Sequence, residues 1–313
     1  MPLVTTTKMF KAAYDGGFAV GAFNVNNMEL LQAIVEAAEA EKAPLIFQIS
    51  KGARAYANIK YLKAMIDVAV AETDLPIAVH CDHGDTFELC KQCVEDGYTS
   101  VMIDGSALPL AENIALAKKV VDFAHSKGVV VEAELGQLAG EEDHVKVEDR
   151  DAVFTNPDDA EKFVKESGCD SLAVAIGTKH GPNKFSGEAK IDFDRLARIQ
   201  EKVPGFPLVM HGSSSVPQEF VDRCNKYGGK LPDARGVPEE MIHKAATEFG
   251  VCKINIDTDL RLVLTAMIRE VFANKPEEID PRKYLGPGRE AIIGMVRHKM
   301  QVLGVSGKAD LCL

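Results

Sequence analysis

The sequence has no excess of basic residues. It contains 36 Lys and Arg but 47 Asp and Glu, which gives a net charge of −11 at pH 7. This acidity excludes broad binding to a nucleic-acid backbone, although the local field of a small site can still favour an anionic substrate. No apolar run approaches the roughly 20 residues that a membrane span requires. The start, "MPLVTTTKMF", lacks the apolar core of a signal peptide. We therefore expect a cytoplasmic protein that binds neither membranes nor nucleic acid.

The number of cysteines is odd. The chain of 313 residues has seven cysteines, which is not typical of a disulfide framework. Cys90 and Cys93 have the C-x-x-C spacing of half a zinc site, but no second such pair exists. The surrounding "DTFELCKQCVEDG" has helical periodicity. We interpret the pair as two cysteines on one helix.

The sequence does contain eight short β-rich runs, separated mostly by amphipathic helical segments. The runs are 19–25, 44–50, 76–84, 99–106, 128–136, 169–177, 206–215 and 250–259. One intervening segment begins with Asn156 and Pro157 in N-cap and first-turn positions and ends at Gly168. Eight strand–helix alternations predict an α/β protein with a closed (β/α)8 TIM barrel. An open, doubly wound sheet is the alternative, but no G-x-G-x-x-G follows the first run.

Two additional C-terminal helices are expected after the eighth run, as an extension of the barrel over about 260–305. Their patterns cover 260–275 and 288–304, and we expect 276–288 to be an exposed connection between them. The sequence shows no internal repeat and no low-complexity tract. We therefore expect residues 1–313 to form a single domain.

Polar residues gather at the predicted carboxyl ends of the runs. In a barrel these ends open onto one face, which is the face that carries catalysis. The residues are Asn24, Ser50, Asp82, His83, Asp104, Glu134, His180, His211, Asn255 and Asp257. Side chains that are far apart in the sequence are therefore expected to converge on one site.

Three histidines of this rim, His83, His180 and His211, each precede a glycine. Three neutral imidazoles suit a zinc ion that keeps an open coordination position and acts as a Lewis acid. Each histidine alone has the alternative of a hydrogen-bonded structural role. Segments 177–185 and 211–217 offer backbone N–H groups and hydroxyls to a phosphate, with ordinary turns as the alternative. Their joint placement favours a metal and phosphate site.

Several segments in order resemble the class II, metal-dependent fructose-1,6-bisphosphate aldolases. They are "GAFNVNN", "DHGD", "VEAELG", "GTKHG", "VMHGSSSVP", "KINIDTD" and "DPRKYLGPGR". The resemblance spans about 1–305, and only the tail 307–313 lies outside it. It implies a zinc-dependent, reversible cleavage of fructose 1,6-bisphosphate to dihydroxyacetone phosphate and glyceraldehyde 3-phosphate, a step of glycolysis and gluconeogenesis.

The resemblance also implies roles for individual residues. His83, His180 and His211 correspond to ligands of the catalytic zinc, and Glu134 to a carboxylate at an alternative metal position. Asp82 corresponds to the acid/base for the C4 hydroxyl, and Glu142 to a loop carboxylate that handles the C3 proton of dihydroxyacetone phosphate. The implied contacts to the phosphate near the zinc are Gly181, Lys184, Gly212 and Ser214. The rest of the pocket is implied to contain Asn24, Ser50, Asn255, Asp257 and Thr258.

The resemblance further implies an assembly and a second ion. Arg282 resembles an arginine that reaches a neighbouring subunit's site and holds the second phosphate, which implies a homodimer or homotetramer. A monovalent cation, Na⁺ or K⁺, is implied near the first phosphate. Glu141 is an alternative to Glu142, and Arg282 has the alternative of an ordinary surface charge. For Asp82 the alternative is a carboxylate that orients a ligand histidine.

Four other functions stay open. Tagatose-1,6-bisphosphate aldolases share the fold and the zinc and differ in the C4 configuration that they accept. A Schiff-base aldolase would use Lys179 or Lys253 and would leave the three histidines unexplained. A metal hydrolase would use the zinc and Asp82 to activate water. A non-enzymatic sugar-phosphate-binding barrel is disfavoured by the intact set of metal and proton-transfer residues.

Overall fold

The computed structural model describes residues 3–142, 145–148, 153–183 and 189–313, and over 141–142 and 145–147 it describes the backbone alone. Eight parallel strands close into a barrel in the order β1-β10-β9-β8-β5-β4-β3-β2. The strands are β1 (Val20–Asn24), β2 (Leu45–Ser50), β3 (Ile77–Gly84), β4 (Ser100–Ile103), β5 (Val130–Leu135), β8 (Ser171–Val174), β9 (Leu208–Met210) and β10 (Val251–Ile256). Each predicted run contains one of these strands. The predicted (β/α)8 barrel is therefore confirmed, and the open sheet is excluded.

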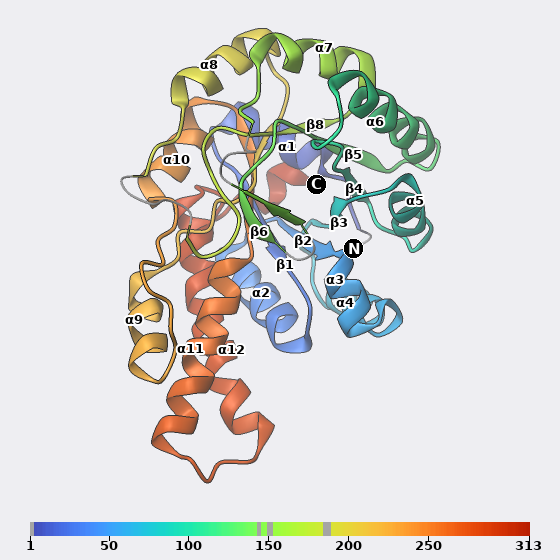
Figure 1. The fold of residues 1–313 in the computed structure, drawn as a ribbon. Helices are drawn as coiled ribbons and strands as arrows, with labels where there is room; N and C mark the ends of the chain where they lie inside the picture. Colours follow the sequence, from blue (N-terminus) through green and yellow to red (C-terminus); the bar gives the residue numbers. More distant parts are fainter. Residues whose placement is uncertain (1–2, 143–144, 149–152, 184–188) are drawn as a thin grey trace.

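Helices surround the strands on the outside of the barrel (Figure 1). They are α1 (Thr6–Gly16), α2 (Met28–Glu41), α3 (Lys51–Ala57), α4 (Ile59–Glu72), α5 (Phe87–Glu95), α6 (Leu110–His125), α7 (Pro157–Ser167), α8 (Phe193–Lys202), α9 (Gln218–Lys226), α10 (Glu239–Glu248), α11 (Thr258–Asn274) and α12 (Pro281–Val302), followed by the short 3₁₀ helix η2 (Ala309–Cys312). The predicted start of α7 is confirmed, because the Asn156 side chain accepts from the N–H groups of Asp158 and Asp159. Over the described ranges, no helix has the length and apolar character needed to cross a bilayer.

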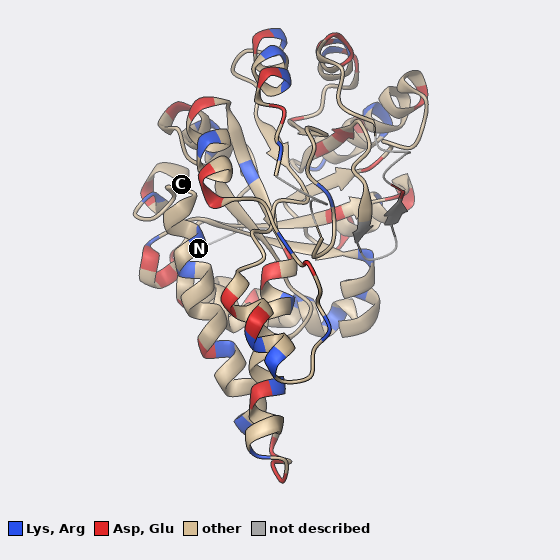
Figure 2. Cartoon of the chain, turned by 60° about the vertical axis from the view of Figure 1, so that its left-hand side comes forward, with Lys and Arg blue, Asp and Glu red and all other residues tan. Residues whose placement is uncertain are grey.

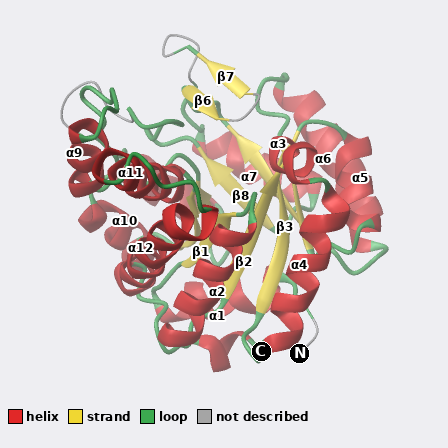
Figure 3. Cartoon of the chain, turned by 90° about the horizontal axis from the view of Figure 1, so that it is seen from below, coloured by secondary structure: helices red, strands yellow, loops and turns green. Residues whose placement is uncertain are grey.

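Cys90 and Cys93 both lie on α5 and are buried, so the interpretation of two cysteines on one helix is confirmed. A short antiparallel hairpin, β6 (Gly140–Glu142) with β7 (Val145–Val147), follows β5. Figure 3 shows this hairpin at the end of the molecule that lies opposite the two chain termini.

Helices α11 and α12 form a long hairpin that projects from the barrel (Figure 1). Both acidic and basic residues lie along it (Figure 2). The prediction of an exposed connection over 276–288 is wrong from Pro281 onward, because α12 begins there and continues through Pro287. The Asp280 side chain accepts from the Arg282 N–H and caps the helix. Gly288 lets α12 pack tightly on α11, since a Cβ there would lie 2.6 Å from Leu264 Cδ1.

The inside of the barrel is unusually polar. TIM barrels are commonly filled by bulky branched side chains. Here the interior apolar cluster is Met102, Ala173 and Val209. Next to it in the strands lie fully or almost fully buried polar side chains, namely Gln48, His80, Glu132 and Lys253. The main hydrophobic core lies between the strands and the surrounding helices.

Candidate active site

Asp82 and His83 reach the mouth of the barrel through an irregularity in β3. Successive residues of a regular strand point to opposite faces. On β3, Cys81 pairs with Val101 but Gly84 pairs with Ile103, so β3 has one extra residue between these pairs. His83 has a positive φ of 44° at this bulge. A bulge redirects side chains, and here His83 Nε2 lies 4.0 Å from Asp82 Oδ1, so both side chains face the same site.

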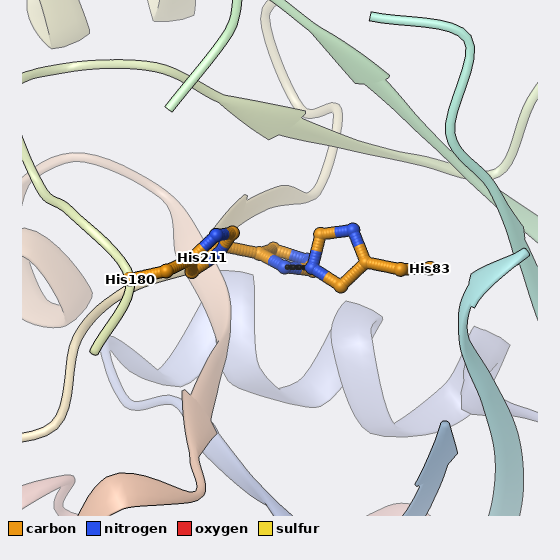
Figure 4. Close-up of side chains that lie close together, drawn as sticks. All are labelled: His83, His180 and His211. Atoms are coloured by element: carbon orange, nitrogen blue, oxygen red, sulfur yellow. Dashed lines mark hydrogen bonds between the residues drawn. The ribbon is translucent and has the colours of Figure 1, made fainter. Parts of the chain in front are cut away.

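The three predicted ligand histidines lie together. His83 lies at the end of β3, His180 follows β8 and His211 follows β9, and all three are buried. One nitrogen of each ring lies within 4.8 Å of the others. The rings converge, with a hydrogen bond between His83 and His211 (Figure 4). Three imidazole nitrogens at this spacing fit the donor set of a zinc ion.

Two carboxylates lie near Nδ1 of His83. Asp104 Oδ2 lies 2.9 Å from His83 Nδ1, and Glu134 Oε2 lies 3.8 Å from the same nitrogen. His83, Asp104 and Glu134 form a second group whose ligand atoms lie within 4.8 Å of one another. Burial alone would lower the pKa of His83, but the Asp104 hydrogen bond and the charges of Asp82 and Glu134 raise it well above its usual value. The same hydrogen bond outweighs burial and lowers the pKa of Asp104.

Asp82 is held by an amide chain from two neighbouring strands. Asn24 Nδ2 donates to Asp82 Oδ2 at 2.8 Å, and Gln48 Nε2 donates to Asn24 Oδ1 at 3.2 Å. Asp82 Oδ1 is buried and accepts no hydrogen bond from the described part of the chain. His83 is oriented by Asp104, because the 4.0 Å separation between Asp82 and His83 is too long for a hydrogen bond.

Two loops that carry predicted phosphate contacts pack against each other. Gly181 and Gly212 have positive φ values of 82° and 60°. A Cβ at Gly212 would lie 2.6 Å from the Lys179 carbonyl oxygen, so this close approach requires glycine. Ser214 is buried in the second loop. Lys184 lies outside the described residues.

The Asp259 carboxylate supports the backbone that follows Ser214. It accepts hydrogen bonds from the N–H groups of Ser215 at 3.1 Å and Val216 at 2.7 Å. Val216 has a φ of 50°, a conformation that is strained for a β-branched residue. Lys299 Nζ lies 3.2 Å from Asp259 Oδ2 and connects this loop to α12.

Most of the other predicted pocket residues line two cavities. Asn24 and Ser50 line one cavity with Tyr56. Gly181, Asp257 and Thr258 line the other. Arg261 lines both cavities and pairs with Asp257 at 2.6 Å, and it was not among the predicted residues. Asn255 lines neither cavity, and its Nδ2 lies 2.9 Å from His211 Nδ1 and 3.2 Å from Nε2.

Two further predicted residues, Glu142 and Arg282, lie on elements other than those that carry the three histidines. Glu142 lies in β6 and pairs with Val145, while its side chain lies outside the described part. Glu141 also lies in β6, so the described backbone does not choose between the two carboxylates. Arg282 is in the first turn of α12, on the projecting hairpin, and its side chain is 89% exposed.

A buried charged cluster below the histidines was not predicted. Lys253 Nζ donates to Glu132 Oε1 at 3.1 Å and to Oε2 at 2.9 Å. Glu132 Oε1 also lies 2.8 Å from His211 Nε2. Burial lowers the pKa of His211 and that of nearby His80. The pattern "VEAE", with two carboxylates two residues apart on one strand, was the available signal.

The fold and this site together define a class of protein. Catalytic residues of TIM barrels lie at the carboxyl ends of the strands, and here that end holds three histidines beside an open carboxylate oxygen. This is the architecture of a metal-dependent barrel enzyme.

Comparison with known proteins identifies the family. The model of the family "Fructose-bisphosphate aldolase class-II" matches residues 4–308. A fructose-bisphosphate aldolase of Treponema pallidum is 49% identical over 98% of this chain and 98% of its own length. One of Thermus caldophilus is 48% identical over 98% of this chain and 100% of its own length. The chain therefore belongs to the class II fructose-bisphosphate aldolases.

Solved structures agree with this assignment. The YdjI aldolase of Escherichia coli K12 has a TM-score of 0.81 and 30% identity, over 98% of this chain and 100% of the other. A putative fructose-1,6-bisphosphate aldolase of Coccidioides immitis has a TM-score of 0.79 and 27% identity, over 96% of both chains.

Proposed function

We propose that this protein cleaves fructose 1,6-bisphosphate reversibly to dihydroxyacetone phosphate and glyceraldehyde 3-phosphate, and that it does so with a bound zinc ion. The observation that carries this proposal is the group of three histidine nitrogens within 4.8 Å of one another. It occurs in a chain that shares 49% identity with a fructose-bisphosphate aldolase over nearly its full length.

His83, His180 and His211 would hold the zinc ion. When bound, the ion supplies a Lewis acid that stabilises the negative charge developing on the ketone fragment as the C3–C4 bond breaks. The group of His83, Asp104 and Glu134 supports the second metal position that the family resemblance implies for Glu134.

Asp82 would accept the C4 hydroxyl proton during cleavage. Asn24 holds one of its oxygens, and the other accepts no hydrogen bond from the described residues and faces the histidines. A general base needs this combination of fixed orientation and an open acceptor. We assign the C3 proton of dihydroxyacetone phosphate to Glu142, since β6 follows directly after β5 at the same end of the barrel.

The loops around Gly181, Gly212 and Ser214 would bind the phosphate near the metal, together with Lys184 and a monovalent cation, Na⁺ or K⁺. Backbone N–H groups in such loops are suited to anions. Asn24, Ser50, Asn255, Asp257 and Thr258 would complete the pocket. The place of four of them in the two cavities, and the 2.9 Å contact of Asn255 with His211, support this role.

Arg282 would bind the second phosphate in a neighbouring subunit, in a homodimer or homotetramer. Its exposure on a hairpin that projects from the barrel supports a contact with another copy of the chain (Figure 1).

An aldol-cleavage assay before and after chelation tests the proposed function. We expect cleavage of fructose 1,6-bisphosphate that EDTA abolishes and Zn²⁺ restores. The assay should include tagatose 1,6-bisphosphate, because preferential cleavage of that sugar would reassign the substrate. Full activity in chelator, with borohydride trapping of the substrate on Lys179 or Lys253, would establish the Schiff-base mechanism instead. The buried ion pair of Lys253 with Glu132 argues against that outcome.

A further inference from the structure

A continuous chain of hydrogen bonds runs through the inside of the barrel and ends at His211. His80 Nδ1 lies 2.8 Å from Ser100 Oγ, and His80 Nε2 lies 3.3 Å from Lys253 Nζ. Lys253 then donates to both oxygens of Glu132, and Glu132 Oε1 lies 2.8 Å from His211 Nε2. Lys253, Glu132 and His211 are each at most 1% exposed, so water does not compete for these bonds.

The donors and acceptors of this chain determine where each proton lies. The lysine ammonium only donates, so His80 accepts at Nε2 and carries its proton on Nδ1, toward Ser100. The carboxylate of Glu132 only accepts, so His211 donates to it from Nε2. A histidine that binds a metal ion has lost its second proton, so Nδ1 is the nitrogen that carries the lone pair.

The groups on the other side of His211 agree with this assignment. Asn255 Nδ2 and His83 Nε2 each lie 2.9 Å from His211 Nδ1. Asn255 Nδ2 also lies 3.2 Å from His211 Nε2, but Nε2 already donates to Glu132, so the amide N–H is left to Nδ1, the nearer nitrogen. Nδ1 is also the nitrogen that faces His83, where the three imidazoles meet.

We propose that Glu132 and Lys253 are positioning residues that hold His211 in the tautomer with its proton on Nε2 and thereby make Nδ1 the metal ligand. The inference rests on the proposed zinc function, and it adds two residues that lie inside the barrel and away from the substrate. Carboxylates that accept the second N–H of a ligand histidine fix the ring and strengthen its donor nitrogen.

Lys253 is needed because an unpaired carboxylate inside the barrel would be strongly disfavoured. With Lys253 opposite, Glu132 stays ionised and the pair adds no net charge beneath the metal site. Three neutral imidazoles then leave the charge of a bound zinc ion undiminished, as a Lewis-acid site requires.

Nitrogen NMR of the zinc-free protein, labelled with ¹⁵N-histidine, tests the assignment without any enzymatic assay. We expect His211 to carry its proton on Nε2 and His80 to carry its proton on Nδ1. A His211 protonated on Nδ1 in the wild-type protein would overturn the proposal.

Glu132→Gln supplies the second test. Lys253 would bind the single amide oxygen, so the amide NH₂ would face His211 Nε2 and drive its proton to Nδ1. We expect the tautomer to switch and the zinc affinity, measured by competition with a chelator, to fall about 10- to 100-fold. A folded Glu132→Gln protein with unchanged tautomer and zinc affinity would contradict the proposal.

The double variant Glu132→Gln with Lys253→Met separates the two residues. Without the lysine, the amide oxygen is free to accept from His211 Nε2, and part of the lost zinc affinity should return. A double variant that binds zinc no better than Glu132→Gln would count against the role of Lys253.

Arg54→Met is the matched control. It removes another buried cation, which pairs with Asp96 at 2.6 Å and bonds Tyr98 at 3.0 Å. It should cost thermal stability and leave zinc affinity and the His211 tautomer unchanged. A failure of the wild-type protein to bind zinc would refute the proposed function. The tautomer assignment is tested independently, by nitrogen NMR of the zinc-free protein.

Discussion

Asp82 and His83 are neighbours in the chain, yet each has its own hydrogen-bond partner. Asn24 holds Asp82, and Asp104 holds His83. The bulge in β3 brings both side chains to the same face. Their proposed roles, proton transfer and metal binding, are therefore separable by mutation.

We expect Asp82→Ala to keep its zinc and to bind dihydroxyacetone phosphate, because neither needs this carboxylate. Cleavage should fall by about 10² to 10⁴, the usual contribution of general acid–base catalysis. Exchange of the C3 proton of dihydroxyacetone phosphate should survive better than cleavage. Zinc content, cleavage rate and proton exchange measured on one preparation check this.

Glu142→Ala should show the opposite pattern, with C3 proton exchange impaired at least as strongly as cleavage. Glu141→Ala is the matched control, because it removes the adjacent carboxylate of β6. A strong loss of exchange in Glu141→Ala alone would transfer the role to that residue.

For the Asp82→Ala variant, loss of zinc would show that the Asp82 carboxylate is structural.

At the scale of elements, Glu41 ties the end of α2 to α12 and the C-terminal segment. It accepts hydrogen bonds from Arg297 at 2.9 Å, Gln301 at 3.1 Å and Ser306 at 2.8 Å. The hydrogen bond from Ser306, followed by that from Arg297, lowers the pKa of Glu41 below its ordinary value of 4.5. The ionised carboxylate therefore stabilises the folded state.

We expect Glu41→Gln to reduce the free energy of unfolding at pH 7 by about 1 kcal/mol, as for the loss of a charged hydrogen bond. A carboxyl with a lowered folded-state pKa contributes stability above its unfolded pKa and loses it as the pH falls through the folded pKa. The difference from wild type should therefore be constant above pH 4.5 and shrink below it. Denaturant unfolding at several pH values measures this, and a pH-independent difference would refute the ionic contribution.

The elements also show where local patterns mislead. The run "LGPGR" contains two glycines and a proline and indicates a break, but α12 runs through it. The Asp280 cap and the contact of Gly288 with Leu264 stabilise the helix against its local propensity. Leu264 lies on α11, so the sequence of α12 alone does not reveal this contact.

At the scale of the whole molecule, the projecting α11–α12 hairpin leads us to expect an assembly. Arg282→Ala should weaken binding of fructose 1,6-bisphosphate far more than that of dihydroxyacetone phosphate, because Arg282 is assigned to the second phosphate. Substrate KM and inhibition by dihydroxyacetone phosphate, with the mass measured by light scattering, check this. Lys283→Ala, one residue further along the same exposed turn, is the control. A fully active monomer would refute the shared site.

The cytoplasmic location stays a prediction.

The sequence by itself determined the eight strand–helix units, because short β-rich apolar runs and helical apolar periodicity are local properties. It also placed His83, His180 and His211 at strand ends, which a parallel barrel gathers at one mouth. Only the tertiary structure decided which side chains pair inside the barrel. Glu132 and Lys253 are 121 residues apart, and His211 is 128 residues from His83. Such pairs depend on strand order, register and the bulge in β3, which arise only when distant segments close the barrel.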